Sequence, residues 1–219
     1  MTLSNPPSDA INALTPSQVE FLKALPKAEL HAHLNGSIPP PILQQLAKEY
    51  VLRDADPDRT VPDIKSRIEQ LQNGVELETI HDFFLLFPAI YALTSTKEAL
   101  ARATGAVLAE FLKIKEGERF PQATYLELRS TPRKTAAMTR MEYLETVLGE
   151  VEEYGPDQAA FIVSLDRGMS VEDATECVEA AITLKDKGRR VVGVDLCGDP
   201  HVSSFRADNS GPCSFHLDW

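Results

Sequence analysis

The sequence predicts an α/β protein of the (β/α)8 barrel type, of which this chain of 219 residues holds about the first half. Short stretches typical of strands alternate with longer stretches that have the 3.6-residue apolar period of helices, a rhythm typical of parallel βαβ units. Four such strands can be counted, and each ends in polar residues capable of binding or catalysis. In a barrel of these units the functional site lies at the C-terminal ends of the strands.

The composition is that of an ordinary globular domain, with 43% apolar and 25% charged residues. The net charge of −11 repels the backbone of DNA or RNA, so no nucleic-acid polymer is expected as a partner. No apolar run approaches the roughly 18 residues that a membrane span needs, and the N-terminus does not read as a secretory signal. Three unpatterned cysteines favour a reducing compartment, and we expect the protein to be cytoplasmic.

The first helix and the first strand carry clear local signals. Residues 1–14 are expected to be a flexible lead-in. A helix is predicted after Thr15, a suitable N-cap, with Pro16 in the first turn and Gln18 at the spacing of a capping box. The stretch KAELHAHL, residues 27–34, is predicted as the first strand, closed by an Asn-Gly turn.

The remaining elements continue this alternation. A helix is predicted after Pro39, residues 51–75 are predicted as a polar excursion rich in Pro and Asp, and one helix is predicted over 80–90. The later elements are expected as a helix over 97–117 that ends at Gly117, a strand over 123–130, a helix over 138–154, a strand over 159–166, a helix over 170–188 capped by Ser170, and a strand over 189–200. Residues 203–219 have neither period and are predicted to be irregular.

Two histidines one residue apart in the first strand are the strongest chemical signal. Side chains alternate along a strand, so Glu29, His31 and His33 are expected on one face, while the residues between them face covering helices. Unpaired imidazoles are costly in a barrel interior. Neutral imidazoles can share a zinc ion at about 2.0–2.1 Å, so the pair predicts a metal site, although a single strand histidine is more often a hydrogen-bonded core residue. A catalytic zinc takes three or more protein ligands, and two histidines do not complete that set.

The stretch that contains this pair, LPKAELHAHLNGS, resembles the opening strand of the adenosine deaminase family. YLELRSTPR (125–133) and VVGVDLCGDP (191–200) are similar to motifs of the second and fourth strands of the same family, in the same order. Asn35 resembles the adenosine-deaminase-like branch, which acts on N6-methyl-AMP, because adenosine deaminases proper usually carry an acidic residue there. The resemblance covers roughly residues 20–202.

The resemblance implies a zinc-dependent hydrolase with one zinc ion that converts a purine nucleoside monophosphate, N6-methyl-AMP, to IMP plus methylamine. It implies His31 and His33 as zinc ligands, and His33 also as a substrate contact. Water on the zinc would attack C6 while a glutamic acid protonates the ring. Asn35 would lie near the ribose and the 5′ end, where it can donate a hydrogen bond to a phosphate that an acidic residue would repel. The other implied substrate-binding residues are Tyr91, Arg129, Ser130, Thr131, Pro132, Asp166 and Gly198.

Several of these positions also have a purely structural interpretation. Asp166 could cap a strand-to-helix turn, and Gly198 could serve a turn rather than the close approach of a ligand. Arg129 could form a structural ion pair with one of two carboxylates, Glu29 or Glu127. The other zinc deaminase fold is excluded, because its H-x-E and P-C-x-x-C patterns do not occur.

The family pattern also includes a third zinc ligand with the general acid, a further histidine and paired aspartates, and the sequence ends at Trp219 before any of them. No catalytic acid is therefore assigned. We predict that residues 15–202 are the N-terminal part of a barrel domain and that 203–219 lie outside the family, as in a truncated product. Alternative functions are an inactive truncated form that acts by interaction, a deaminase of adenosine or AMP, and another H-x-H barrel hydrolase. A monomer is expected if the chain is full-length.

Overall fold

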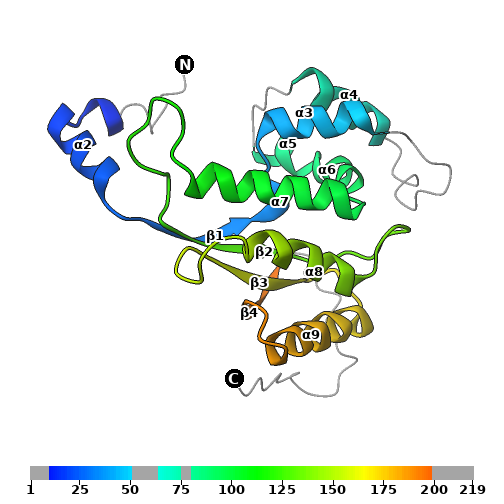
Figure 1. The fold of residues 1–219 in the computed structure, drawn as a ribbon. Helices are drawn as coiled ribbons and strands as arrows, with labels where there is room; N and C mark the ends of the chain where they lie inside the picture. Colours follow the sequence, from blue (N-terminus) through cyan, green and yellow to red (C-terminus); the bar gives the residue numbers. More distant parts are fainter. Residues whose placement is uncertain (1–9, 51–63, 75–79, 199–219) are drawn as a thin grey trace, which may run out of the picture.

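A four-stranded parallel sheet with the order β1-β2-β3-β4 forms the centre of the computed structural model, which describes residues 10–50, 64–74 and 80–198. Strands that are neighbours in the sequence are neighbours in the sheet, and all three pairs are parallel (Figure 1). The four predicted strands are therefore confirmed. They are β1 (Ala28–His33), β2 (Tyr125–Ser130), β3 (Ala159–Asp166) and β4 (Val191–Cys197).

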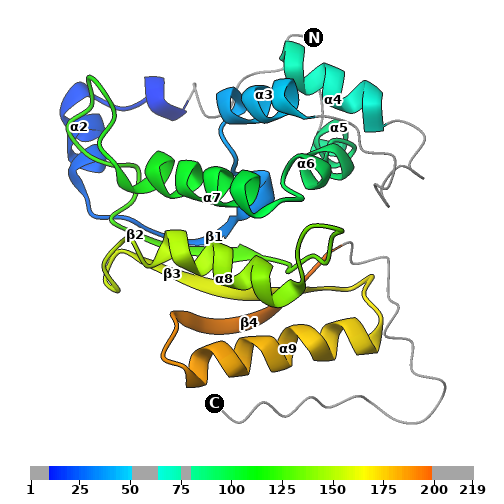
Figure 2. The same ribbon diagram turned by 45° about the vertical axis from the view of Figure 1, so that its right-hand side comes forward.

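Helices form the connections between these strands. Figure 2 shows α7, α8 and α9 side by side along the sheet. The apolar side chains of Leu126, Leu128 and Phe161 are fully buried in the core that lies between the strands and these helices. The described helices are α2 (Pro16–Ala24), the short 3-10 helix η1 (Leu34–Gly36), α3 (Pro40–Glu49), α4 (Ile64–Asn73), α5 (Ile80–Phe84), α6 (Phe87–Leu93), α7 (Lys97–Leu112), α8 (Arg140–Val151) and α9 (Val171–Asp186).

The first strand is less regular than its sequence predicts. The register of β1 against β2 shifts between Glu29 and Ala32, which indicates a bulge that breaks the two-residue alternation. Glu29 is thereby in register with the buried Leu126, on the face opposite to the two histidines. The prediction that Glu29 shares their face is wrong, and Leu30, which was expected to face helices, is 54% exposed.

Two predicted boundaries between β1 and β2 are also wrong. Within the predicted excursion, residues 64–73 form helix α4, because Ile64, Ile68 and Leu71 have helical spacing and are buried in the core beside α3. Residues 51–63 lie outside the described part of the chain. The single helix predicted over 80–90 is divided into α5 and α6, with Pro88 in the first turn of α6, where a missing N–H is tolerated.

Helix α7 ends at Leu112, five residues before the predicted end at Gly117. Lys113 already has an extended backbone, with ψ of 144°, and Gly117 has a φ of +80° in the segment that follows. The N-terminal boundaries were easier to predict. Thr15 and Gln18 form the expected capping box, and the side chain of Ser170 caps α9.

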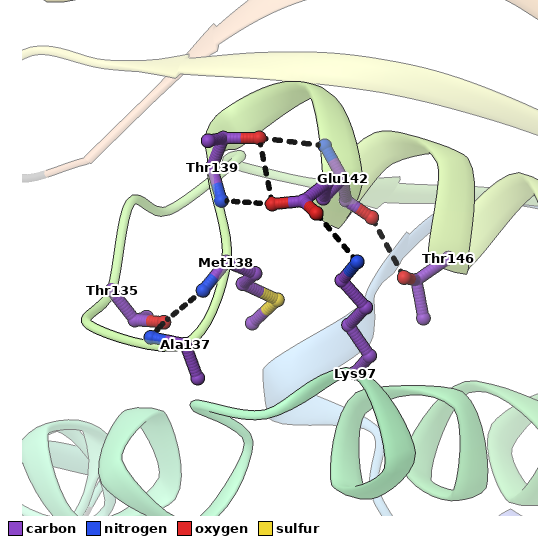
Figure 3. Close-up of polar contacts among 7 residues, drawn as sticks. All are labelled: Lys97, Thr135, Ala137, Met138, Thr139, Glu142 and Thr146. Carbon is purple, nitrogen blue, oxygen red and sulfur yellow. Dashed lines mark hydrogen bonds and ion pairs between the residues drawn. The ribbon is translucent and has the colours of Figure 1, made fainter.

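The start of α8 is fixed by a second capping box and by an ion pair with the neighbouring helix (Figure 3). Thr139 Oγ1 accepts from the Glu142 backbone N–H at 3.2 Å, and the Thr139 N–H donates to Glu142 Oε2 at 2.8 Å. Lys97 Nζ on α7 lies 2.5 Å from Glu142 Oε1. These contacts lower the pKa of Glu142 to about 2, with the Lys97 hydrogen bond as the largest cause.

Helix α2 buries none of its residues. It lies at the N-terminal end of β1, away from the helices that cover the sheet (Figure 2). None of the described helices is long and apolar enough to cross a membrane. The predicted irregular segment 203–219 lies outside the described residues.

Candidate functional site

The parallel strands place the predicted site residues that they carry at the C-terminal end of the sheet. His33 lies beside Arg129 in the strand register, and Asp166 lies beside Cys197. These residues are at or next to the last positions of their strands. The C-terminal ends of all four strands, and the segments that follow them, therefore form a single region, as expected for a site in parallel α/β proteins.

The two histidines of β1 share a face, and their ring centroids are 5.2 Å apart. His31 is exposed and His33 is half-buried. Burial lowers the pKa of His33, and electrostatic interactions with the neighbouring Arg129 and His31 side chains lower it further. His33 is therefore a neutral imidazole at physiological pH, which is the form that binds a metal ion.

The two imidazoles fit only part of a zinc site. Arg129 Nη1 lies 2.8 Å from Nδ1 and 3.1 Å from Nε2 of His31, so it donates to the unprotonated ring nitrogen. In the part of the chain that the structure describes, no group of three or more His, Cys, Asp or Glu side chains is placed to hold an ion. His31 and His33 thus suit two of the three or more protein ligands that a catalytic zinc takes, and their ligand role stays a prediction.

Arg129 connects the first strand of the sheet with the last. Its side chain is 9% exposed, and its guanidinium contacts His31 and forms an ion pair with Asp195 of β4. The predicted pairing with Glu29 or Glu127 is wrong. Glu29 accepts the backbone N–H of His31 at 2.8 Å instead, and Glu127 accepts the hydroxyl of Tyr125 at 3.0 Å.

Asn35 occupies a buried polar cluster directly after β1. Its side chain is 8% exposed, and its Nδ2 donates to Thr94 Oγ1 of the segment after α6 at 3.3 Å. Ser130 Oγ donates to Asn35 Oδ1 at 3.3 Å and lies 2.7 Å from the hydroxyl of Tyr143 on α8. Ser130 is 3% exposed, and both predicted substrate contacts are therefore held by protein partners.

The ring of Tyr91, on α6, is stacked against the cationic side chain of Arg133. The guanidinium carbon of Arg133, in the segment after β2, lies 3.6 Å from the ring centroid of Tyr91. Burial raises the pKa of Tyr91, and Asp166 and Cys197 raise it further, whereas Arg133 lowers it. The phenol is therefore neutral, and the stacked guanidinium supplies a positive charge beside the strand ends.

The segment after β2 contacts both the last strand and helix α8. The hydroxyl of Thr131 lies 3.4 Å from Cys197 Sγ. The carbonyl of Pro132 accepts a hydrogen bond from Arg140 Nη1 at 2.7 Å. Arg140 also pairs with Asp173 of α9 at 2.5 Å, so the segment that carries Arg133 is fixed to two helices.

Asp166 and Gly198 meet at the ends of β3 and β4. Asp166 Oδ1 accepts the backbone N–H of Gly168 at 2.7 Å, so the turn-capping interpretation of Asp166 is confirmed. Gly198 has a φ of +95°, and a Cβ atom there would lie 3.0 Å from both carboxylate oxygens of Asp166. This close approach requires glycine. The additional substrate-binding roles of both residues stay predictions.

Strands β1 to β4 and the helices between them define an α/β protein of the barrel class, and residues 26–208 match the adenosine deaminase family. The chain belongs to that family, as the sequence motifs predicted. It is 35% identical over 195 residues to the N6-Methyl-AMP deaminase-L of Xenopus laevis, an alignment that covers 86% of this chain and 51% of the relative. The chain thus spans about half the length of the curated relatives that it matches.

Solved structures agree with this assignment. The apo N6-methyl-AMP deaminase from Arabidopsis thaliana superposes with a TM-score of 0.64 at 29% identity, covering 85% of this chain and 53% of that chain. An Arabidopsis relative complexed with IMP gives a TM-score of 0.63 at 29% identity, with 84% and 53% covered. The predicted fold class is confirmed: the four strands correspond to part of a deaminase barrel.

The structure adds three residues that the sequence interpretation did not single out: Arg133, Thr94 and Tyr143. Arg133 is part of the quoted motif RSTPR, and a second arginine at a strand end was an available signal for an anionic ligand. Thr94 and Tyr143 lie 59 and 108 positions from Asn35 in sequence, and no local pattern connects them with it. Their relation to the site is visible only in the fold.

Proposed function

We propose that this chain carries the first half of the active site of a zinc-dependent deaminase that converts N6-methyl-AMP to IMP and methylamine. The observation that carries the proposal is the His31–His33 pair at the end of β1, beside Arg129 and within a family match that covers most of the chain. The names of the relatives and the IMP complex of one of them support the same substrate class. Hydrolysis at C6 consumes one water and releases the amine.

In this proposal His31 and His33 hold the zinc ion. When bound, zinc supplies a water molecule with a pKa lowered toward neutrality, which suits attack on C6 of the purine. The neutral state of His33 favours ligation, because a protonated imidazole has no lone pair to offer. The hydrogen bond from Arg129 uses the one lone pair of the neutral His31 ring, so His31 has to exchange this contact for the zinc ion, while the ion pair with Asp195 keeps the guanidinium in place.

The nucleotide is proposed to lie over the ends of β2 to β4. Asn35 favours a monophosphate because its amide nitrogen can donate to phosphate oxygens, whereas an acidic side chain would repel them. Arg133, stacked on Tyr91, adds a positive charge for the same group. Thr131, Pro132, Asp166 and Gly198 are proposed as the wall of the pocket.

The setting of the enzyme is part of the proposal. Two free cysteines, Cys177 and Cys197, in the described residues agree with a reducing compartment, and we place the reaction in the cytoplasm. The net charge of −11 argues against a nucleic-acid polymer as partner and leaves a small nucleotide as ligand. A monomer is the proposed form of the complete enzyme.

A second candidate function is nucleotide binding without turnover. It is favoured by a specific observation: the described residues supply two histidine ligands and no cluster of three ligating side chains. Such a chain would still present Asn35, Arg133 and Tyr91 to a nucleotide. It would differ from the enzyme in retaining affinity for IMP while releasing no methylamine.

The decisive experiment is deamination of N6-methyl-AMP by the purified, zinc-supplemented chain, with IMP followed by chromatography. The matched control is the double variant His31→Ala, His33→Ala. IMP formation that is lost in the double variant supports the enzyme. Binding of IMP by a folded chain that forms no product supports the second candidate, and a chain that binds neither zinc nor IMP refutes both.

A further inference from the structure

A continuous hydrogen-bond chain runs through the buried cluster around Asn35. Thr94 Oγ1 donates to the carbonyl of Ile90 at 2.9 Å, so its lone pairs are left to accept from Asn35 Nδ2 at 3.3 Å. On the other side of the amide, Ser130 donates to Asn35 Oδ1 at 3.3 Å, and Ser130 and Tyr143 share the 2.7 Å bond. The chain joins α6, η1, β2 and α8.

The hydrogen bonds of this cluster have only one consistent assignment of donors and acceptors. Ser130 uses its single proton on Asn35, so the hydroxyl of Tyr143 must donate to Ser130. Tyr143 is 1% exposed, and Ser130 is its hydrogen-bond partner among the described residues. Burial raises the pKa of Tyr143 to about 12, so this hydroxyl remains a donor at physiological pH.

The direction of these hydrogen bonds determines that Oδ1 of Asn35 faces Ser130 and that Nδ2 faces Thr94. If the side-chain amide of Asn35 were rotated by 180°, Nδ2 would face Ser130 and would donate a hydrogen bond to the Ser130 hydroxyl oxygen, which would then have one lone pair left. One of the two buried hydroxyl protons, on Ser130 or on Tyr143, would then have no acceptor, which is costly in the protein interior. The observed orientation leaves one N–H of Asn35 uncommitted, because an amide nitrogen has two.

We propose that Tyr143 and Thr94 are positioning residues that fix the Asn35 amide from its two sides and thereby set the preference of the site for a nucleoside monophosphate over a nucleoside. The preference for a monophosphate rests on the proposed function. Tyr143 acts through Ser130, whose hydroxyl it holds in place, and Thr94 acts directly on Nδ2. A turned or loosened amide would present its oxygen to the phosphate, which carries only acceptors.

The chain offers a matched control for each variant. Tyr143→Phe and Thr94→Val remove one hydroxyl each, and Thr94→Ser retains it. Thr104 on α7 is fully buried and donates to the carbonyl four residues earlier, as Thr94 does, but it is not part of this cluster, so Thr104→Val controls for the loss of a buried hydroxyl. Tyr154 is partly buried in the same core, so Tyr154→Phe controls for the loss of a tyrosine hydroxyl outside the cluster.

The first measurement needs no ligand. Side-chain amide signals of Asn35 are recorded by NMR on the ¹⁵N-labelled full chain and assigned by their loss in Asn35→Ala. We expect shifted and faster-exchanging signals in Tyr143→Phe and Thr94→Val, and unchanged signals in Thr104→Val, Tyr154→Phe and Thr94→Ser. Signals that are the same in all variants would overturn the positioning role.

The second measurement separates positioning from general stability. Calorimetric affinities for IMP and for inosine are compared in the same variants. We expect Tyr143→Phe and Thr94→Val to weaken IMP binding by up to about tenfold, the loss of roughly one hydrogen bond, with inosine affinity changed by less than about twofold. An unchanged IMP-to-inosine ratio refutes the inference but not the proposed function. A parent chain that binds neither ligand refutes the proposed function, and the specificity role with it.

Discussion

Replacing Gly198 by alanine should destabilise the protein through backbone strain and a steric conflict. The φ of +95° is a conformation that side chains with L configuration rarely adopt, at a cost of about 1–3 kcal/mol. The added Cβ would also lie 3.0 Å from both Asp166 carboxylate oxygens and 3.1 Å from the Arg167 backbone nitrogen. The backbone contact cannot be relieved by a side-chain rotation. We therefore expect a loss of roughly 2–3 kcal/mol in the free energy of unfolding.

Urea unfolding monitored by circular dichroism measures this loss. Gly149, inside α8, is the matched control, because a Cβ there meets no atom within 4 Å and φ is not positive. Gly149→Ala should stabilise the chain by about 0.5–1 kcal/mol through helix propensity. The reasoning is refuted if Gly198→Ala loses less than about 0.5 kcal/mol. It is also refuted if the two substitutions have the same sign.

Three further outcomes are expected. Ile68→Ala should cost about 2–4 kcal/mol in urea unfolding because its side chain is 5% exposed, whereas a loose excursion at 64–73 would give a change below about 0.5 kcal/mol. The folded-state pKa of Glu142 is lowered to about 2, so its contribution to stability is present above the unfolded value near 4.5 and is lost as the pH falls toward 2. Glu142→Gln should therefore flatten the dependence of the melting temperature on pH across that window, and an unaltered pH profile would contradict this. Chelation of zinc should lower the melting temperature of the parent chain but not of His31→Ala, His33→Ala, and equal shifts in both would exclude a site at this pair.

The sequence was most informative where a structural feature is determined by neighbouring residues. The strand over 159–166 was predicted with the boundaries that the structure has, because its apolar run is continuous and buried on both sides. The caps at Thr15 and Ser170 were predictable because an N-cap needs only the three residues that follow it. Helix α4 was missed because its ten residues are mostly polar, and three apolar side chains at helical spacing do not stand out in an acidic, Pro-rich stretch.

The sequence indicated candidate site residues near the strand ends, whose roles stay predictions, but it did not indicate their contacts. The pattern AELHAH is regular, so nothing in it indicates the bulge that separates Glu29 from the histidines. The partner of Arg129 is Asp195, which is 66 positions away and becomes its neighbour only when four strands are in register. Asn35 was expected to face a ligand, and its hydrogen bonds to Thr94 and Ser130 could not be predicted without knowledge of the fold.

The spacing of the strands along the chain has a kinetic consequence. Residues 34–124 separate β1 from β2, whereas 131–158 and 167–190 separate the later strands, a loop roughly three times longer. Closing the longer loop costs about 1 kcal/mol more in chain entropy. Local contacts form first in such topologies, so β2, β3 and β4 are expected to pair before β1 docks, an order that pulsed hydrogen exchange can test. The strand that carries both histidines is then the last to join the sheet, so the two proposed zinc ligands reach their final positions only after the rest of the scaffold has formed.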